Sequence, residues 1–157
     1  MCHYCGCRQV PLIRDYIAEH ESITTLGMRM TKLMGHGDVA AAQALVPEFA
    51  AMLDRHWQGE EEGVFVAMAA ADEMYADYIA PLVAEHRDLA AFLAGADLAD
   101  PEDARRFAAE IVALADHIER EEDGLFPATL VTLDGPDWDA AFDAWHRAHP
   151  GEELIAD

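Results

Sequence analysis

The sequence has few positive charges and no long apolar run. Ten lysine and arginine residues face 31 aspartate and glutamate residues, and the formal net charge is −21 at pH 7. This charge repels phosphate backbones and anionic lipid surfaces, so we expect neither nucleic acid nor membrane as a partner. No stretch reaches the roughly 18–20 apolar residues of a membrane span. The N-terminal MCHYCGC lacks the order of a signal peptide. We therefore expect a soluble, cytoplasmic protein.

Strand-like alternation is nearly absent, and helical periodicity dominates instead. The pattern predicts long helices at about 11–34, 38–69, 74–93 and 101–123, and a shorter one at about 136–149. Asp38 is the expected N-cap of the second helix, and Pro127 is expected to close the fourth. Short connections between long amphipathic helices favour antiparallel neighbours.

The predicted fold is therefore all-α, an up-down antiparallel four-helix bundle over residues 11–130. A Cys-rich segment at residues 1–10 precedes the bundle, and a C-terminal helical extension at residues 131–157 follows it.

The chain also contains an internal repeat. IAEHESI at 17–23 resembles VAEHRDL at 83–89, and HWQGEEEGVF at 56–65 resembles HIEREEDGLF at 117–126. The first two helices therefore look like a copy of the next two. Two helical hairpins of this kind would face each other across the core about an approximate two-fold axis.

Four of the eight histidines lie in the apolar stripes, one in each long helix, at positions that the repeat matches: His20, His56, His86 and His117. A single histidine on an apolar face is usually a hydrogen-bonded core residue. That explanation does not account for four of them at matched positions in four helices.

Two carboxylates accompany these histidines. Glu60 follows His56 by four residues and Glu121 follows His117 by four, so each pair shares the core face of its helix. An ionised carboxylate there is costly unless it is paired or bound to a cation, and no lysine or arginine falls on the inner stripes at that level. We interpret the neighbouring acidic residues as a solvated run: Glu61, Glu62, Glu122 and Asp123.

Imidazole and carboxylate groups together suit iron, zinc or manganese. Two carboxylates shared between two ions, with two histidines for each ion, would make a compact two-metal site. Ferritin-like di-iron bundles use Glu-x-x-His instead, with more carboxylates than imidazoles. The order here is His-x-x-x-Glu, so the ferritin pattern fits less well.

The pieces AEH, HWQGEEEGVF, AEH and HIEREEDGLFP together resemble the hemerythrin family, in its HHE cation-binding branch, over residues 11 to about 130. The resemblance implies a non-haem di-iron centre with an oxo or hydroxo bridge. The implied ligands are His20 and His56 on one iron, His86 and His117 on the other, and Glu60 and Glu121 as bridges. Such centres bind O₂ or respond to peroxide or nitric oxide. The implied partner is a small diatomic or peroxide, for sensing, storage or detoxification. Enzymatic activity stays undecided, and no protein partner is identified.

The sequence departs from oxygen-carrying hemerythrins at two places. They carry His-x-x-x-His in the third helix, whereas Leu82 and Ala90 flank His86 at that spacing here. They also carry His-x-x-x-x-Asp in the fourth helix, where this chain has Glu122, although helix geometry and the repeat favour Glu121.

The missing histidine leaves a coordination position for water, a diatomic or a side chain such as Tyr16, one turn before His20. It also argues against simple reversible O₂ carriage. The ligand set is closer to family members that repair iron centres or handle nitric oxide. An iron donor for damaged iron–sulfur or di-iron centres is therefore an alternative, and a zinc-stabilised helical interaction module is another.

Two matched glycines, Gly63 and Gly124, lie seven residues after a ligand histidine. They either mark fraying near a helix end or leave room beside the metals for a ligand. The matched Phe65 and Phe126 are interpreted as packing that keeps the site dry.

The N-terminal segment holds all the cysteines of the chain. Cys2, Cys5 and Cys7 have the spacing Cys-x-x-Cys-x-Cys, with His3 among them. Three thiolates at this spacing suit one soft metal, with zinc expected and His3, His146 or His149 as fourth ligand. A redox thiol cluster or a disulfide with a free thiol is equally compatible with the pattern.

Overall fold

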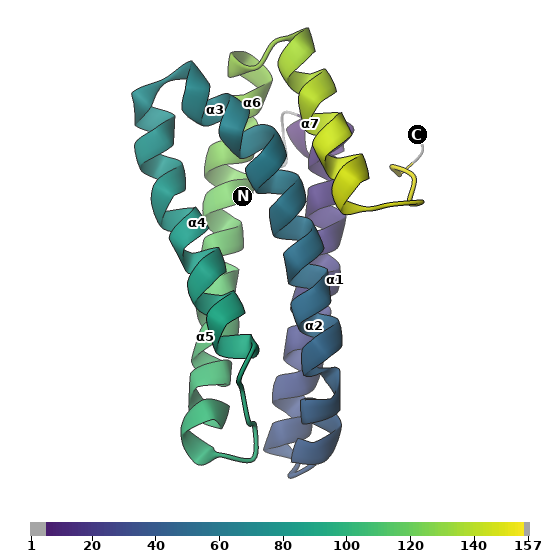
Figure 1. Ribbon diagram of the computed structural model, residues 1–157, viewed down its shortest axis with the longest axis vertical. Helices are drawn as coiled ribbons and strands as arrows, with labels where there is room; N and C mark the ends of the chain where they lie inside the picture. The colour runs from purple at the N-terminus through teal and green to yellow at the C-terminus, as the bar shows by residue number, and fades with distance from the viewer. Residues whose placement is uncertain (1–5, 156–157) are drawn as a thin grey trace.

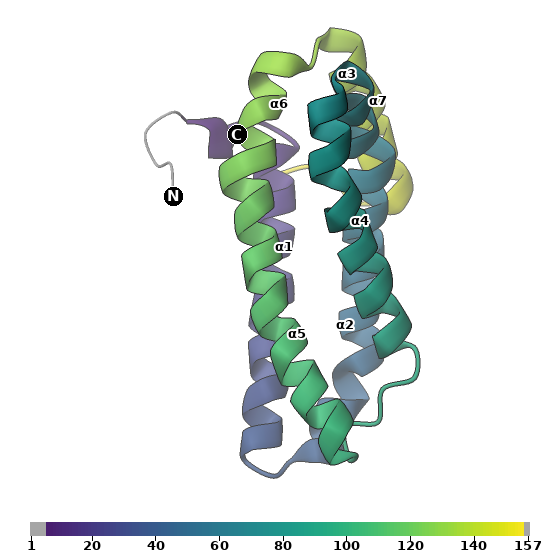
Figure 2. The same ribbon diagram turned by 90° about the vertical axis from the view of Figure 1, so that its left-hand side faces the viewer.

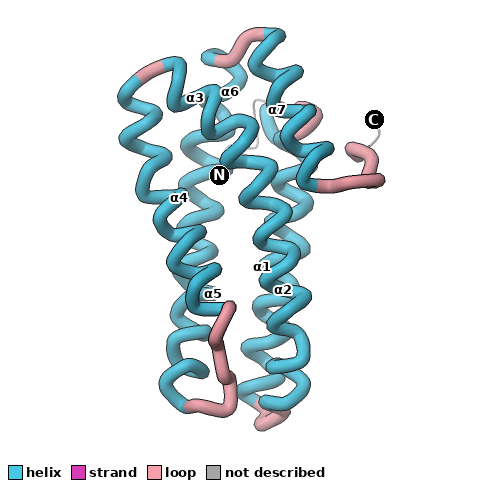
Figure 3. The backbone as a smooth tube through the Cα atoms, viewed as in Figure 1, coloured by secondary structure: helices cyan, strands magenta, loops and turns pink. Residues whose placement is uncertain are grey.

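The computed structural model describes residues 6–155, and these residues form an all-helical bundle without strands. Four long helices lie along the long axis of the molecule (Figure 1 and Figure 2): α1 (Ile13–Gly35), α2 (Val39–Glu60), α4 (Glu73–Leu93) and α5 (Pro101–Arg120). Shorter helices complete the chain: the 3₁₀ turn η1 (Cys7–Gln9), α3 (Val66–Ala71), α6 (Phe126–Thr132) and α7 (Gly135–Ala148). Loops are short and lie between the helix ends (Figure 3).

Aspartates begin most of the helices. Their carboxylates accept hydrogen bonds from backbone N–H groups in the first turns of α2, α4, α5 and α7: Asp38, Asp72, Asp100 and Asp134. These bonds satisfy N–H groups that have no partner inside a helix. The predicted cap at Asp38 is confirmed, and so are the five predicted helices, with ends shifted by a few residues.

Two π-helical turns interrupt stretches that were predicted as unbroken α-helix. The turn η2 (Glu61–Phe65) separates α2 from α3, and η3 (Glu121–Leu125) separates α5 from α6. Both turns fall in matched segments of the repeat, EEEGVF at 60–65 and EEDGLF at 121–126. The prediction that Pro127 closes the fourth helix is wrong, because the chain continues as α6 to Thr132. Pro127 lies in the first turn of α6, where a proline costs no hydrogen bond.

The described residues form two apolar core clusters. One is built around Met30, Phe49 and Phe107, and the other around Tyr16, Phe65 and Phe126. The histidines lie between them along each long helix. In α1, for example, His20 stands between Ile17 of one cluster and Ile23 of the other. A polar layer therefore divides the hydrophobic core.

The helix α7 packs against α2 and η2 (Figure 1). Beyond α7, the chain returns to the start of α1, where the Ile155 N–H donates to the Asp15 carboxylate at 2.7 Å. No helix within residues 6–155 is both long enough and apolar enough to cross a membrane.

Candidate metal centre

The structure brings all six sequence-predicted ligands together in the polar layer. We call them the His/Glu cluster: His20 from α1, His56 and Glu60 from α2, His86 from α4, His117 from α5 and Glu121 at the start of η3. Each is at most 3% exposed. Their ligand atoms form two overlapping groups within 4.8 Å, one with His20, His56 and Glu60 and the other with His86 and His117. Glu121 belongs to both groups.

Each histidine of the cluster contacts a carboxylate through its outer nitrogen, Nδ1. The pairs are His20 with Glu122 at 2.9 Å, His56 with Glu19 at 2.7 Å, His86 with Glu61 at 2.8 Å and His117 with Glu85 at 2.7 Å. We call these four glutamates the outer carboxylates. An ionised carboxylate only accepts hydrogen bonds, so Nδ1 carries the proton in each pair. In the neutral ring, Nε2 is then left with a lone pair directed into the cluster.

The interior of the cluster consists of acceptors. Nε2 of His86 and Nε2 of His117 lie 2.9 Å apart. The four carboxylate oxygens of Glu60 and Glu121 are buried and have no hydrogen-bond partner among residues 6–155. His117 Nε2 is 2.8 Å from a Glu121 oxygen, but this contact lacks the direction of a hydrogen bond. Acceptors crowded together out of water need a cation between them, so these residues fit bound metal.

In the metal-free protein, bound protons offset part of the repulsion between these acceptors. Burial, with the nearby Glu121 charge, raises the pKa of Glu60 well above its ordinary value. Burial opposes ionisation of Glu121 as well, but His117, His20 and His86 outweigh it and hold the pKa of Glu121 well below its ordinary value. Burial likewise disfavours charge on His20, yet Glu121 and Glu122 raise its pKa to about 9. Metal binding therefore has to displace protons from this cluster.

The outer carboxylates correct the interpretation of the acidic run. Glu61 and Glu122 were expected in solvent, but they bind His86 and His20, and the Glu122 side chain is only 13% exposed. Glu62 is exposed as expected. Each of these two glutamates points away from the core face of its own helix. A histidine of the other hairpin lies in that direction, His86 for Glu61 and His20 for Glu122.

Sequence reasoning missed two further outer carboxylates, Glu19 and Glu85. Both precede a ligand histidine, in IAEHESI and VAEHRDL, and both are matched by the repeat. Glu61 and Glu122 are matched in the same way. Their repetition in both copies is the sequence signal that would have identified all four.

Within residues 6–155, no side chain takes the place of the missing helix-three histidine. Leu82 is fully buried in the apolar cluster around Tyr16, and Ala90 is exposed. The Tyr16 hydroxyl donates to the Gly59 carbonyl at 2.8 Å, and burial raises its pKa well above the ordinary value. Tyr16 therefore supports α2 with its hydroxyl protonated.

The repeated glycines leave room for neighbouring elements. A Cβ on Gly63 would lie 3.3 Å from the Ala141 Cα in α7, and one on Gly124 would lie 2.5 Å from the Tyr78 hydroxyl. The space beside the two glycines, which could have admitted a ligand, is therefore filled by Ala141 and Tyr78. Phe126 and Phe65 stack on His20 and His86, with ring centroids 5.9 Å apart in both pairs.

The predicted N-terminal metal or redox site falls largely outside the described residues, which exclude Cys2, His3 and Cys5. Cys7 is buried as a free thiol. Two of the three proposed fourth ligands lie among the described residues: His146 is exposed, whereas His149 is buried with Nδ1 2.9 Å from the Trp145 carbonyl. His149 is thus engaged within the bundle, and the site at the cysteines stays a prediction.

A family model described as the hemerythrin HHE cation binding domain matches residues 12–129, a span that contains the whole His/Glu cluster. No curated protein and no solved structure matches the chain.

Proposed function

We propose, on the premise that this chain belongs to the hemerythrin HHE cation-binding family, that it is a non-haem di-iron protein. It would bind or react with O₂, peroxide or nitric oxide in sensing, storage or detoxification. The four long helices would form an up-down bundle around the two metals.

The observation that carries the proposal is the acceptor-only interior of the His/Glu cluster. His20 with His56 would hold one iron and His86 with His117 the other, in line with the two groups of ligand atoms. Glu121 belongs to both groups, and Glu60 lies within 4.0 Å of His20, His56 and His86, so each carboxylate would serve both metals. Six protein ligands for two ions leave coordination positions for an external molecule.

The surrounding residues hold this arrangement. The outer carboxylates fix the ring orientation of the histidines and make Nε2 more basic. Trp57 and Phe65 stack on His86, and Phe126 stacks on His20, so the inner faces of the rings are shielded from water. Two bound irons would supply electrons to a small oxidant, and the chain provides the rigid, dry enclosure.

The test is the absorption spectrum of iron-loaded protein before and after addition of O₂, peroxide or nitric oxide, with metal quantified alongside. We expect a spectral change with at least one of the three, and none in a His56→Ala/His117→Ala control. Protein that retains zinc in place of iron, with a spectrum that none of the three alters, would instead support a metal-stabilised interaction module.

A further inference from the structure

The two halves of the repeat have diverged on their outer surfaces. A cleft lies beside each pair of ligand helices, one against α1 and α2 and the other between α4 and α5. Their linings correspond through the repeat: Glu19, Ser22, Ile23, Met52 and Arg55 match Glu85, Asp88, Leu89, Ala113 and Asp116. The clefts are therefore equivalent places in the two hairpins.

In the first half, α7 covers the outer carboxylate. The Trp145 indole N–H donates to Glu19 at 2.6 Å, and His149 stacks on Trp145 with centroids 4.4 Å apart. A Cβ on Gly59 would lie 3.6 Å from Trp145 and 3.4 Å from Tyr16, so the glycine allows both rings to approach. This side of the centre is closed by packed aromatic side chains.

In the second half, an exposed ion pair takes the place of that cover. Arg120 matches Gly59 in the repeat, and its guanidinium donates to Glu85. The two side chains are 38% and 45% exposed. An exposed pair contributes little free energy, so these side chains can separate readily.

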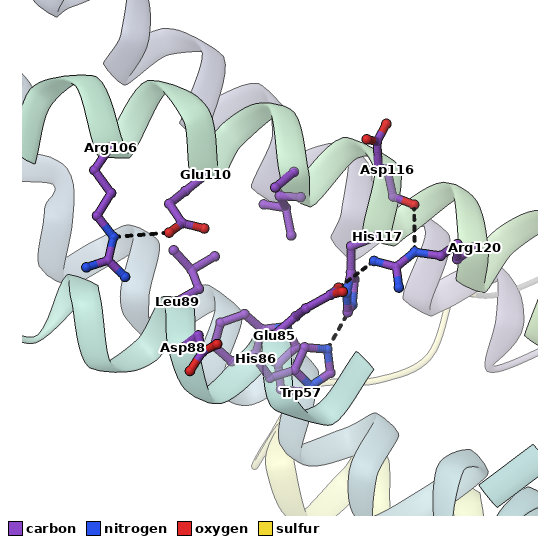
Figure 4. A pocket seen from close by; sticks show the side chains of 12 residues that line it. Trp57, Glu85, His86, Asp88, Leu89, Arg106, Glu110, Asp116, His117 and Arg120 are labelled. Atoms are coloured by element: carbon purple, nitrogen blue, oxygen red, sulfur yellow. Dashed lines mark hydrogen bonds and ion pairs between the residues drawn. The ribbon is translucent and has the colours of Figure 1, made fainter. Parts of the chain in front are cut away.

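Behind this pair, the α4–α5 cleft has a volume of ≈ 400 Å³ and is lined by His86 and His117 themselves. Figure 4 shows Arg106 and Glu110 at one end of the cleft, and His117 and Arg120 at the other. Apolar side chains also line it, and among them Trp57 stacks on His86 with centroids 4.7 Å apart.

The charge of the cleft is negative. Arg106 pairs with Glu110 at 3.2 Å and Arg120 pairs with Glu85, so both cations are neutralised. Asp88 and Asp116 have no ion pair within residues 6–155 and leave an excess of negative charge. Such a field repels anions and admits uncharged molecules.

We propose that the α4–α5 cleft is the entrance for small uncharged ligands, such as nitric oxide or hydrogen peroxide, and that α7 closes the equivalent entrance on the other half. The ligand then arrives at the metal held by His86 and His117. This inference rests on the proposed function, because it assumes metal in the His/Glu cluster.

The test compares Ala113→Phe, which narrows the cleft, with Met52→Phe at the matched position beside α1. Ala113 is exposed, so the larger side chain does not disturb the core. Iron content is measured first, then the rate of nitric oxide binding by stopped-flow absorbance and the rate of iron loss to a chelator. We expect Ala113→Phe to slow both rates about tenfold, and Met52→Phe to leave them unchanged.

A second variant tests the charge of the entrance. Asp88→Asn/Asp116→Asn changes only exposed side chains, and it should speed azide binding several-fold without changing the nitric oxide rate. Iron-loaded Ala113→Phe protein with wild-type rates would overturn the entrance, and an unchanged azide rate would overturn the selection against anions. Wild-type protein that holds no iron would instead overturn the proposed function, so the two failures are distinguishable.

Discussion

Each histidine of the His/Glu cluster uses its two ring nitrogens differently, and this division predicts the effect of neighbouring substitutions. Glu61→Gln removes the charge that orients His86, whereas Glu62→Gln changes an exposed residue that pairs with Arg147. We expect Glu61→Gln to weaken metal binding about 10–100-fold, because loss of such an outer partner has effects of that size.

Glu62→Gln is the matched control and should leave metal affinity unchanged. Competition with a chelator of known affinity measures both variants. Equal affinities for Glu61→Gln and Glu62→Gln would show that the outer carboxylates do not act on the metal.

Glu60 should destabilise the metal-free protein as the pH rises. Its pKa in the folded state is raised well above the ordinary value of 4.5, mainly by burial and then by Glu121. The folded chain therefore keeps a proton that the unfolded chain releases above about pH 4.5, and the free energy of unfolding falls as the pH increases. Glu60→Gln removes this titration.

We expect the stability of metal-free Glu60→Gln, relative to metal-free wild type, to grow between about pH 5 and pH 8, while metal content falls. Urea denaturation in the presence of a chelator, repeated across this pH range, measures the difference. A difference that stays constant with pH contradicts the buried, proton-holding state of Glu60.

The inner ligands were predictable from sequence, but most of their partners were not. His56 and Glu60 share a helix face, so periodicity within one helix finds them. Glu61 points about 100° away from Glu60, a direction that usually faces solvent. In the folded protein, His86 of the other hairpin lies in that direction. Periodicity within one helix carries no information about a neighbour on another helix.

The π-helical turns are the main feature of the elements that sequence periodicity did not predict. Each inserts one extra residue into a helix, and a single shift is too small to break an apolar stripe visibly. The helices themselves, the cap at Asp38 and the fifth helix followed from pattern alone. Pro127 was misjudged because the helix restarts after η3, and its first turn tolerates proline.

The two glycines of these turns should respond differently to substitution. A side chain on Gly63 meets the backbone of Ala141 in α7, whereas one on Gly124 meets the hydroxyl end of the half-exposed Tyr78. We expect Gly63→Val to lower the free energy of unfolding by about 1–3 kcal/mol, as overpacking does.

Gly124→Val should cost less, because the Tyr78 side chain can swing into solvent. Chemical denaturation of the metal-loaded variants compares them. A larger loss for Gly124→Val would contradict the packing of α7 against η2.

The helix α7 supplies a hydrogen bond to the outer carboxylate Glu19 through Trp145. Trp145→Phe leaves the half-buried Glu19 without its indole donor, and we expect a loss of about 1–3 kcal/mol in the free energy of unfolding. Trp138→Phe in the same helix is the matched control, with an expected change within about 0.5 kcal/mol. Urea denaturation followed by circular dichroism distinguishes them, and equal effects would rule out a specific role for the Trp145 contact.

At the scale of the whole molecule, a layer of buried acceptors divides the hydrophobic core in two. The chain also carries a net charge of −21, so bound cations relieve repulsion both inside the core and across the molecule. Metal removal should therefore lower the melting temperature substantially, since a ligand that binds only the folded state stabilises it. Calorimetry with and without a chelator measures the shift, and an unchanged melting temperature would argue against a metal in the core.

The most direct test of the central claim is the number of irons bound per chain. Iron-loaded wild-type protein, freed of loosely bound metal and assayed by mass spectrometry of the elements, should hold about two irons per chain. His20→Ala/His56→Ala and His86→Ala/His117→Ala should each lose metal, because each removes both histidines of one group. Wild-type protein with fewer than about two irons, or metal content that survives both double substitutions, would contradict a di-iron centre in the His/Glu cluster.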